Sequence, residues 1–495
     1  MNSQQDPIIV IGAGIGGLST AIHLATEGYP VIVLEKNQAV GGKMALHRQD
    51  GYTWDTGPSV ITMKPVLTSL FEKAGRRLDD YVTLQPVDPL TRYLYPDGTI
   101  LDATRDLTRM TEQIEAIEPR DVEGYLRFLA HAAALHRITD PIFIHGEPPT
   151  VGDIVRIPIR DMVKVDAWRS MNRAIRGWVR SPQLRDMLRR YATYVGASPY
   201  RAPAVLNVIA HNELTRGIWY PQGGIYTVAR AYHRLATEVG VKVRTGCKVD
   251  QILIDAGRAT GVRTEGGERL QGQAVISNVD VITTYHDLLP ESVSHPTLKR
   301  LTRFELSLSG FVLLLGLEGT TPALRQHNVL FPNNYRSEFT DIFQKQRPPR
   351  SPTVYITISA RSDPGHAPKN CENWFVLVNV PALTPSTNWK TDAPRLRERI
   401  LDRIEDQGIK VRGRIRSEAI RTPENIRSRT GAWRGSLYGL SSNQPLNALR
   451  RPNPRSPDVQ GLYFTGGTTH PGGGVPMVTL SGNVTAGMVR EDLET

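Results

Sequence analysis

The sequence predicts an α/β protein in which a Rossmann-like, doubly wound domain is built from discontinuous segments and carries an inserted α+β domain. Three observations support this prediction. A strand–helix–strand pattern opens the chain, a strand–loop–helix pattern closes it, and the long middle part has a different periodicity. The length of 495 residues also exceeds what one hydrophobic core usually serves, so we expect two closely joined domains.

The opening pattern is short and regular. Ile8–Ile11 is an apolar, β-branched run, which is typical of a buried strand. Apolar residues then recur at helical spacing from Leu18 to Ala25, and Gly28 ends that helix. Val31–Leu34 is a second apolar run of strand length. Together these elements form the β-α-β unit with which a doubly wound sheet begins.

The later segments alternate between two kinds of pattern. Residues 205–285 predict more α/β structure: a helix near Val228–Val239, a strand at Val241–Arg244, and a β meander that ends at Val275–Ser277. Residues 90–200 indicate mostly helix, with many basic side chains and little strand alternation. Residues 305–385 contain β-rich stretches such as Gly310–Leu317 and Trp374–Val380. A strand at Tyr463–Thr465 and a helix from about Met477 to Met488 close the chain.

We therefore predict two domains that are interleaved in the sequence. The first, a cofactor-binding domain, comprises residues 1–90, 205–290 and 440–495. The second, which we expect to bind the substrate, comprises residues 91–204 and 291–439.

Composition excludes several classes of protein. Hydrophobic residues make up 40% of the chain and charged residues 22%, a balance that is typical of a folded domain and not of a disordered one. Cys247 and Cys371 are the only cysteines, so we expect neither a disulfide scaffold nor a cysteine zinc site. So few cysteines fit a protein of the reducing cytoplasm. No signal peptide or membrane-spanning run is apparent. The net charge is +11, but no nucleic-acid-binding motif accompanies it.

The first motif is a glycine-rich turn between strand and helix. Gly12, Gly14 and Gly17 fit the G-x-G-x-x-G pattern, in which glycines permit a tight turn, close approach to a pyrophosphate, and close packing of helix on strand. The helix N-terminus then offers amide donors to the phosphates. Glu35 follows the second strand, where its carboxylate suits ribose hydroxyls. These residues predict an adenine dinucleotide, but they do not separate NAD from FAD.

Two further motifs distinguish these cofactors. The pair Gly41–Gly42 with Lys43, followed by Asp55-Thr56-Gly57-Pro58, resembles the flavin-binding opening of the amine oxidase and phytoene desaturase superfamily. Lys43 stands where arginine is usual, which keeps the charge but loses the bidentate fork. The closing stretch Leu462–Val478 resembles the C-terminal signature of bacterial-type phytoene desaturases. Its glycines allow backbone to lie against a flat ring, and Pro476 suits the first turn of a helix whose N-terminus would stabilise charge on reduced flavin.

The resemblance covers almost the whole length and implies FAD and a linear carotenoid substrate taken from a membrane. Segments in the middle of the chain match the family as well, among them Tyr194–Pro199, Ile218–Gly224, Ser277–Asp280 and Asp363–Pro368. The FAD-binding residues that we expect from these motifs are Gly12, Gly14, Gly16, Gly17, Glu35, Lys36, Gly42, Lys43, Thr56, Gly57, Pro58, Ser59, Val249, Gly467, Gly474, Val475, Pro476 and Met477.

The reaction is harder to predict than the cofactor. The family resemblance favours desaturation, in which hydrogen is removed across a C–C bond of a linear carotenoid. The sequence Gly472-Gly473-Gly474-Val475-Pro476-Met477 departs from plain desaturases and resembles relatives that oxidise terminal groups of linear carotenoids to aldehydes. An isomerase, an amine or porphyrinogen oxidase, and a non-enzymatic GDP-dissociation inhibitor of the same fold are further alternatives. Flavin absorbance of the purified protein separates the last from the others.

Few groups are candidates for acid–base work or for membrane contact. His470 lies in the glycine-rich loop and is the one catalytic candidate, although a structural role is the more common reading; His211 and Glu213 are speculative. No metal site is expected.

In residues 156–190 many arginines accompany an apolar stripe that includes Trp168 and Trp178. This pattern predicts either a helix in a lipid interface or a helix packed on the core. We expect a cytoplasmic protein at the inner face of the cell membrane, and the sequence does not predict its oligomeric state.

Overall fold

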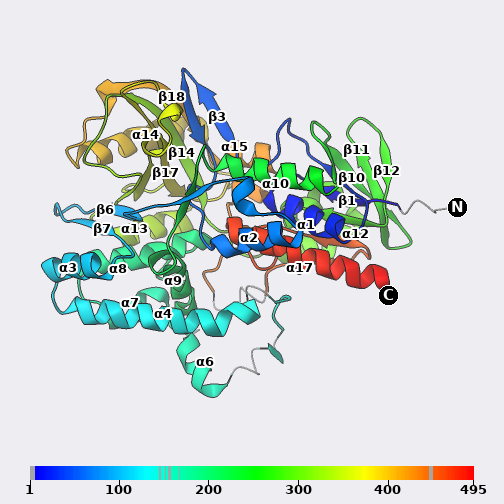
Figure 1. Ribbon diagram of the computed structural model, residues 1–495, viewed down its shortest axis with the longest axis horizontal. Coiled ribbons are helices and arrows are strands. Elements are labelled where there is room, and N and C mark those ends of the chain that lie inside the picture. Colours follow the sequence, from blue (N-terminus) through cyan, green and yellow to red (C-terminus); the bar gives the residue numbers. More distant parts are fainter. Residues whose placement is uncertain (1–5, 144–145, 151, 154–157, 167, 445–449) are drawn as a thin grey trace.

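The computed structural model describes residues 6–143, 146–150, 152–153, 158–166, 168–444 and 450–495. In the view of Figure 1, the elements around β1 (Ile8–Ile11) lie to the right, the large sheet around β14 (Ser309–Glu318) lies at the upper left, and the helical region that contains α4 (Asp121–Phe143) and α7 (Met171–Trp178) lies below. Within the described residues, no helix is both long and apolar enough to cross a membrane.

A five-stranded parallel sheet forms the core of the right-hand part. Its order is β19 (Leu462–Phe464), β13 (Ala274–Ser277), β1 (Ile8–Ile11), β2 (Val31–Leu34) and β9 (Lys242–Arg244). Helices α1 (Ile15–Thr26), α2 (Lys64–Lys73), α10 (Tyr226–Glu238) and α17 (Val475–Glu494) pack together beside it. The strands come from three stretches that are far apart in the sequence, whereas the exact domain boundaries given above stay a prediction.

The helices beside this sheet approach one another closely because small residues lie between them. A Cβ on Gly17 would lie 2.2 Å from the carbonyl oxygen of Gly12, and one on Gly482 would lie 2.5 Å from the Ser19 side chain. The α1–β1 and α1–α17 contacts therefore depend on glycine at these two positions.

One strand of the expected β meander belongs elsewhere. Strands β10 (Val249–Asp255), β11 (Arg258–Thr264) and β12 (Arg269–Gln271) form a separate antiparallel sheet. β13 instead pairs in parallel with β1 and β19. Its four residues are all buried, as expected for a strand that is covered on both faces.

A seven-stranded mixed sheet forms the second large layer. Its order is β18 (Ile415–Arg421), β14 (Ser309–Glu318), β17 (Cys371–Val380), β16 (Val354–Thr357), β15 (His327–Leu330), β6 (Thr91–Leu94) and β7 (Ile100–Ala103). The prediction of little strand in residues 90–200 is therefore wrong for β6 and β7. They pair as a hairpin across Pro96-Asp97-Gly98, which is a recognisable turn sequence. Helix α14 (Trp389–Glu405) packs against this sheet.

The basic region 156–190 is not one interfacial helix. Its described part forms α6 (Ile159–Val165), α7 (Met171–Trp178) and α8 (Pro182–Arg189); residues 156, 157 and 167 lie outside the described part. Met171, Ile175 and Val179 are fully buried against α4 (Asp121–Phe143). The expected lipid-facing stripe is therefore largely core packing, because helical periodicity does not reveal which surface covers the apolar face. Trp168 is the exception, with 87% of its surface exposed.

Shorter elements connect these layers. They are β3 (Leu46–Gln49), β4 (Tyr52–Asp55), β5 (Leu84–Pro86), α3 (Leu107–Ile117), α9 (Val208–Leu214), β8 (Trp219–Pro221), α11 (Val281–Thr283), α12 (Glu291–Leu301), α13 (Tyr335–Phe339) and α15 (Pro423–Thr430). β3 and β4 form the expected hairpin before Thr56. α15 follows β18 of the large sheet, yet it reaches the end of β2: Lys36 Nζ donates to the Ser428 carbonyl at 2.7 Å.

Candidate functional site

A cavity of about 1420 Å³ lies between the parallel sheet and the large mixed sheet. One half begins where β1, β2 and β13 end, at Gly12, Glu35 and Asn278. Ligands of open α/β sheets bind outside these carboxyl ends. The other half is lined by side chains from the large sheet. Of the predicted cofactor-binding residues, all except Gly17 and Met477 line this cavity.

Glu35 is buried at the nucleotide end, with 4% of its surface exposed. Its Oε2 accepts a hydrogen bond from Ala13 N at 2.8 Å, and its Oε1 accepts from Asn37 N at 2.9 Å and Asn37 Nδ2 at 2.6 Å. These three donors hold the carboxylate at the cavity wall, beside Val249 and Lys36. A carboxylate in this position accepts ribose hydroxyls and repels a 2′-phosphate.

The glycine-rich turn leaves backbone exposed to the cavity. Gly12 has φ +97°, a conformation that favours glycine. A Cβ on Gly14 or Gly16 would come within 2.5 or 2.8 Å of the Asn278 side chain. Gly14 caps α1 without any side-chain hydrogen bond, and Gly14, Ile15 and Gly16 line the cavity. The first amides of α1 are thus free to bind phosphate oxygens.

A second helix N-terminus meets the cavity at the C-terminal motif. Gly474, with φ +108°, caps α17 without a side-chain hydrogen bond, and Val475 and Pro476 follow it along the wall. Nearby backbone is packed so tightly that a Cβ on Gly473 would lie 2.5 Å from the Tyr438 ring, and one on Gly57 would lie 2.2 Å from the Lys43 carbonyl oxygen. Glycine at both sites keeps this part of the cavity wide enough for a flat ring system.

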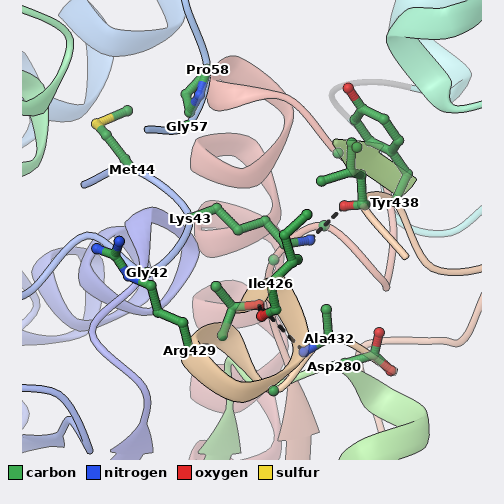
Figure 2. A pocket seen from close by; sticks show the side chains of 18 of the residues that line it. Gly42, Lys43, Met44, Gly57, Pro58, Asp280, Ile426, Arg429, Ala432 and Tyr438 are labelled. Atoms are coloured by element: carbon green, nitrogen blue, oxygen red, sulfur yellow. Dashed lines mark hydrogen bonds between the residues drawn. The ribbon is translucent and has the colours of Figure 1, made fainter. Parts of the chain in front are cut away.

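Charged side chains flank the space between the two helix ends: Asp280 is buried, Lys43 is partly buried and Arg429 is exposed. Lys43 Nζ donates to the Leu437 carbonyl at 2.5 Å, and Figure 2 shows its side chain crossing the pocket towards Tyr438. Burial lowers the pKa of Lys43, and the Asp280 carboxylate opposes that shift. Burial likewise raises the pKa of Asp280, which Trp433 N–H and Lys43 counter. Desolvation also lowers the pKa of Arg429, which lies at another wall of the pocket in Figure 2. These cations suit a ligand with a diphosphate.

The half of the cavity at the large sheet combines an apolar wall with a polar one. Its apolar wall consists of Val60, Leu308, Val312, Val329, Phe375, Leu377 and Leu383. Its polar wall consists of Ser59, Arg190, Tyr194, Tyr335, Thr353, Tyr355 and Asn379. Apolar side chains together with placed polar groups are typical of sites for small molecules that carry both apolar and polar parts.

These features fit FAD together with an apolar ligand. The carboxylate at Glu35, the uncapped N-terminus of α1 and the uncapped N-terminus of α17 line one cavity, and they suit the adenosine, diphosphate and flavin of FAD respectively. FAD, when bound, supplies hydride and electron transfer. These residues would bind and orient it, and the dipole at the N-terminus of α17 would favour negative charge on a reduced ring held there.

Comparisons with known proteins agree with this geometry. The model of the family described as flavin containing amine oxidoreductase matches residues 15–489. The chain belongs to this family. It is therefore an FAD-dependent oxidoreductase, as the sequence motifs predicted, and its α/β FAD-binding fold is confirmed.

Individual relatives share most of their length with this chain. A protein named 4,4'-diapolycopene oxygenase from Methylomonas sp is 36% identical over 499 residues, which cover 100% of each protein. A 4,4'-diaponeurosporene oxygenase from Staphylococcus aureus strain bovine RF122 / ET3-1 is 35% identical over 483 residues, 97% of each. The solved structure of an oxidoreductase from Methanosarcina mazei superposes with a TM-score of 0.66 over 99% of this chain and 100% of that one, at 17% identity, which shows a shared fold.

The three acid–base candidates lie outside the cavity lining. His470 is buried, its Nε2 lies 3.0 Å from the Gly146 carbonyl oxygen, and burial lowers its pKa to about 4. His211 packs edge-on against His136, and burial lowers its pKa to about 4. Glu213 is fully buried in an ion pair with Arg190 at 2.9 Å. These contacts account for each side chain without a catalytic role.

Two of the predicted cofactor-binding residues do not line the cavity, and a segment that was not predicted does. Gly17 lies behind the turn, where it allows α1 to pack on Gly12, and Met477, in the first turn of α17, packs against the core. Sequence reasoning missed the α15 segment with Arg429, which lines the cavity although it follows β18. The cluster of arginines in residues 421–429 was a signal that could have identified it. Among the described residues, no group of His, Cys, Asp or Glu is arranged to hold a metal ion.

Proposed function

We propose that this protein is an FAD-dependent oxygenase that converts the terminal group of a linear carotenoid to an aldehyde in carotenoid biosynthesis. The observation that carries the proposal is the 36% identity, over the full length of both chains, with a 4,4'-diapolycopene oxygenase. A 4,4'-diaponeurosporene oxygenase is similar over 97% of its length. Desaturation, the first expectation from the sequence, is therefore the second candidate, and isomerisation the third.

The site supports a long apolar substrate next to the flavin. Ser59 and Val60, at the start of the apolar half, follow directly on Gly57 and Pro58 of the FAD half. Phe375 and Leu377 of β17 extend the apolar wall along the sheet. A polyene that lies on this face would bring its end towards the flavin, and burial in the cavity would exclude water from the reacting carbon.

Product analysis separates the three reactions. The purified FAD-loaded protein would be incubated with 4,4'-diapolycopene in vesicles under air labelled with heavy oxygen. We expect products in which an end methyl group has lost two hydrogens and gained one labelled oxygen. Loss of hydrogen without oxygen would show a desaturase, and an unchanged mass with a shifted absorption spectrum would show an isomerase. An unaltered carotenoid in every condition would refute the proposal.

We also propose that the protein contacts a membrane surface with the segment around α6 and α7. Trp168 is 87% exposed and Met162 is 41% exposed. Exposed basic side chains accompany them, namely Lys164, Arg169, Arg173 and Arg176. An apolar anchor with surrounding cations suits the interface of an anionic bilayer, such as the inner face of the cell membrane.

The lipid contact is testable with one position. Trp168→Glu should weaken binding to vesicles that contain anionic lipid, because it replaces the exposed indole with a charge, while Trp168→Phe should retain most of it. Both variants should keep bound FAD, because Trp168 does not line the cavity. Equal vesicle binding by wild type and Trp168→Glu would contradict this part of the proposal.

A further inference from the structure

A chain of hydrogen-bonded side chains ends at the boundary between the two halves of the cavity. Ser59 Oγ and the Tyr355 hydroxyl are 2.7 Å apart, and His327 Nδ1 lies 2.9 Å from the same Tyr355 hydroxyl. Thr357 Oγ1 is a longer neighbour of His327 Nδ1, at 3.3 Å. Ser59 and Tyr355 line the cavity, whereas His327 lies behind them and is almost fully buried.

The position of the proton on His327 decides which side chain donates and which accepts in each of these hydrogen bonds. Burial lowers the pKa of His327 to about 3, and nearby Arg190 lowers it further, so the ring is neutral and carries one proton. Nε2 is buried and has no hydrogen-bond partner among the described residues. A buried N–H without an acceptor costs more than a lone pair without a donor, so the proton belongs on Nδ1. His327 therefore donates to Tyr355, and Tyr355 donates to Ser59.

This direction leaves the Ser59 hydrogen without a partner inside the protein. Among the described residues, Tyr355 is the one polar partner of Ser59 Oγ, and Ser59 already accepts from it. The Ser59 O–H is therefore free to donate into the cavity. A hydrocarbon pressed against it would leave a desolvated donor unsatisfied, whereas an oxygen atom on the ligand would accept its hydrogen bond.

The neighbouring wall is polar as well. Arg190 donates to Glu213 at 2.9 Å and to the Tyr93 hydroxyl at 2.9 Å, and Tyr194 donates to Glu213. The Arg190 guanidinium also lies over the rings of Tyr93, Tyr191 and Tyr194, within 5.2 to 5.4 Å of their centroids. Such a network costs free energy to bury, which makes it more suited to a site for a polar ligand group than to a wall for a pure hydrocarbon.

We propose that Ser59 donates a hydrogen bond to an oxygen atom on the end of a linear carotenoid, with Tyr355 and His327 as positioning residues. The inference rests on the proposed function. Conversion of an end methyl to an aldehyde passes through an oxygen-bearing stage, and this site retains that end next to Gly57 and Pro58, where the FAD half begins. The preferred ligand of this position is thus an oxygenated carotenoid, not the hydrocarbon from which it is made.

Binding to the FAD-loaded protein tests the proposal without turnover. Anaerobic titrations would use two probes, 4,4'-diapolycopene and the linear dialdehyde of the same carbon skeleton, followed by visible absorption. Ser59→Ala should weaken aldehyde binding about 5- to 10-fold, the effect of one neutral hydrogen bond, and should not weaken hydrocarbon binding, because it removes the donor that a hydrocarbon leaves unsatisfied. It should also abolish the red shift of the bound aldehyde. Ser59→Thr, which keeps the hydroxyl, should restore both.

Variants of Tyr355 distinguish the loss of a positioning hydrogen bond from a general loss of stability. Tyr355→Phe removes the donor to Ser59 and should reduce the aldehyde preference about 2- to 5-fold. Tyr95→Phe is the matched control, because its buried hydroxyl donates to the Gln183 carbonyl and lies outside the cavity lining; it should change neither affinity. Flavin content and melting temperature of each variant would confirm an intact fold.

The outcomes distinguish this inference from the proposed function. If Ser59→Ala changes both affinities equally, or neither, the inference is wrong even where labelled oxygen enters the product. If the aldehyde preference depends on Ser59 but no oxygen enters the hydrocarbon, the proposed function is wrong and the oxygen-binding site stands. If neither probe binds the wild-type protein, both fail.

Discussion

Replacement of Glu35 by glutamine is the sharpest test of the nucleotide end of the site. The carboxylate takes three hydrogen bonds, one at Oε2 from Ala13 N and two at Oε1 from Asn37. Glutamine has one acceptor oxygen and one NH₂ group of nearly the same shape. If the oxygen keeps the two Asn37 bonds, the NH₂ group faces the Ala13 N–H, and two buried donors are left in contact.

The size of the effect follows from these contacts. The buried donor pair should lower the free energy of unfolding of the FAD-free protein by about 1 to 2 kcal/mol. A ribose hydroxyl that donated to the carboxylate also loses a charge-assisted hydrogen bond, worth about 1.5 to 3 kcal/mol. The FAD dissociation constant should therefore rise about 10- to 150-fold.

Two measurements keep the contributions apart. Quenching of flavin fluorescence on titration of FAD-free protein gives the dissociation constant, and urea unfolding of the same preparation gives the stability. Glu72→Gln, on the exposed face of α2, is the control and should change neither value. An FAD affinity of Glu35→Gln within twofold of wild type would show that Glu35 does not contact the cofactor.

Three further substitutions test packing and titration. Gly17→Ala should lower the unfolding free energy by about 1 to 3 kcal/mol in urea unfolding, because its Cβ would lie 2.2 Å from the Gly12 carbonyl oxygen; unchanged stability would show that α1 can shift. Gly487→Ala on α17, where a Cβ meets nothing within 4 Å, should instead stabilise the protein by about 0.5 to 1 kcal/mol in the same assay, and a loss of stability would contradict this. Burial raises the pKa of Glu338 to about 7, so this group should lower the unfolding free energy by about 3 kcal/mol as the pH rises from about 4.5 to about 7. That pH dependence should be weaker in Glu338→Gln, and parallel pH profiles of wild type and variant would refute the assignment.

The two ends of the chain were predictable because their signals are local. In β1, α1 and β2 the apolar runs, the helical spacing and the glycines act within a few residues of one another, and the structure places all three elements where they were expected. The cavity likewise gathers the residues of both end motifs. A turn that binds a diphosphate depends on backbone shape, which glycine positions encode directly.

The middle of the chain was less predictable because its contacts are distant. The stripe with Met171 and Ile175 has the same periodicity whether lipid or protein covers it, and the covering helix α4 could not be identified from spacing. Ser59 and Tyr355 are 296 residues apart, so no sequence pattern links their hydroxyls. Only the pairing of β16 with β15 and β17 brings Tyr355 to the cavity and His327 behind it.

The distribution of these contacts bears on how members of one fold perform different reactions. The structure from Methanosarcina mazei shares the architecture at 17% identity. A shared fold does not by itself specify a substrate. The glycine turn, Glu35 and the N-terminus of α17 are the features that we expect to serve the cofactor, whatever the substrate. Differences in reaction must therefore arise where the large sheet meets the flavin end. In this chain that boundary is occupied by Ser59, Tyr355 and His327, so substitutions of Tyr355 and His327, which are not among the expected FAD-binding residues, should alter the choice of carotenoid end group while FAD affinity stays constant.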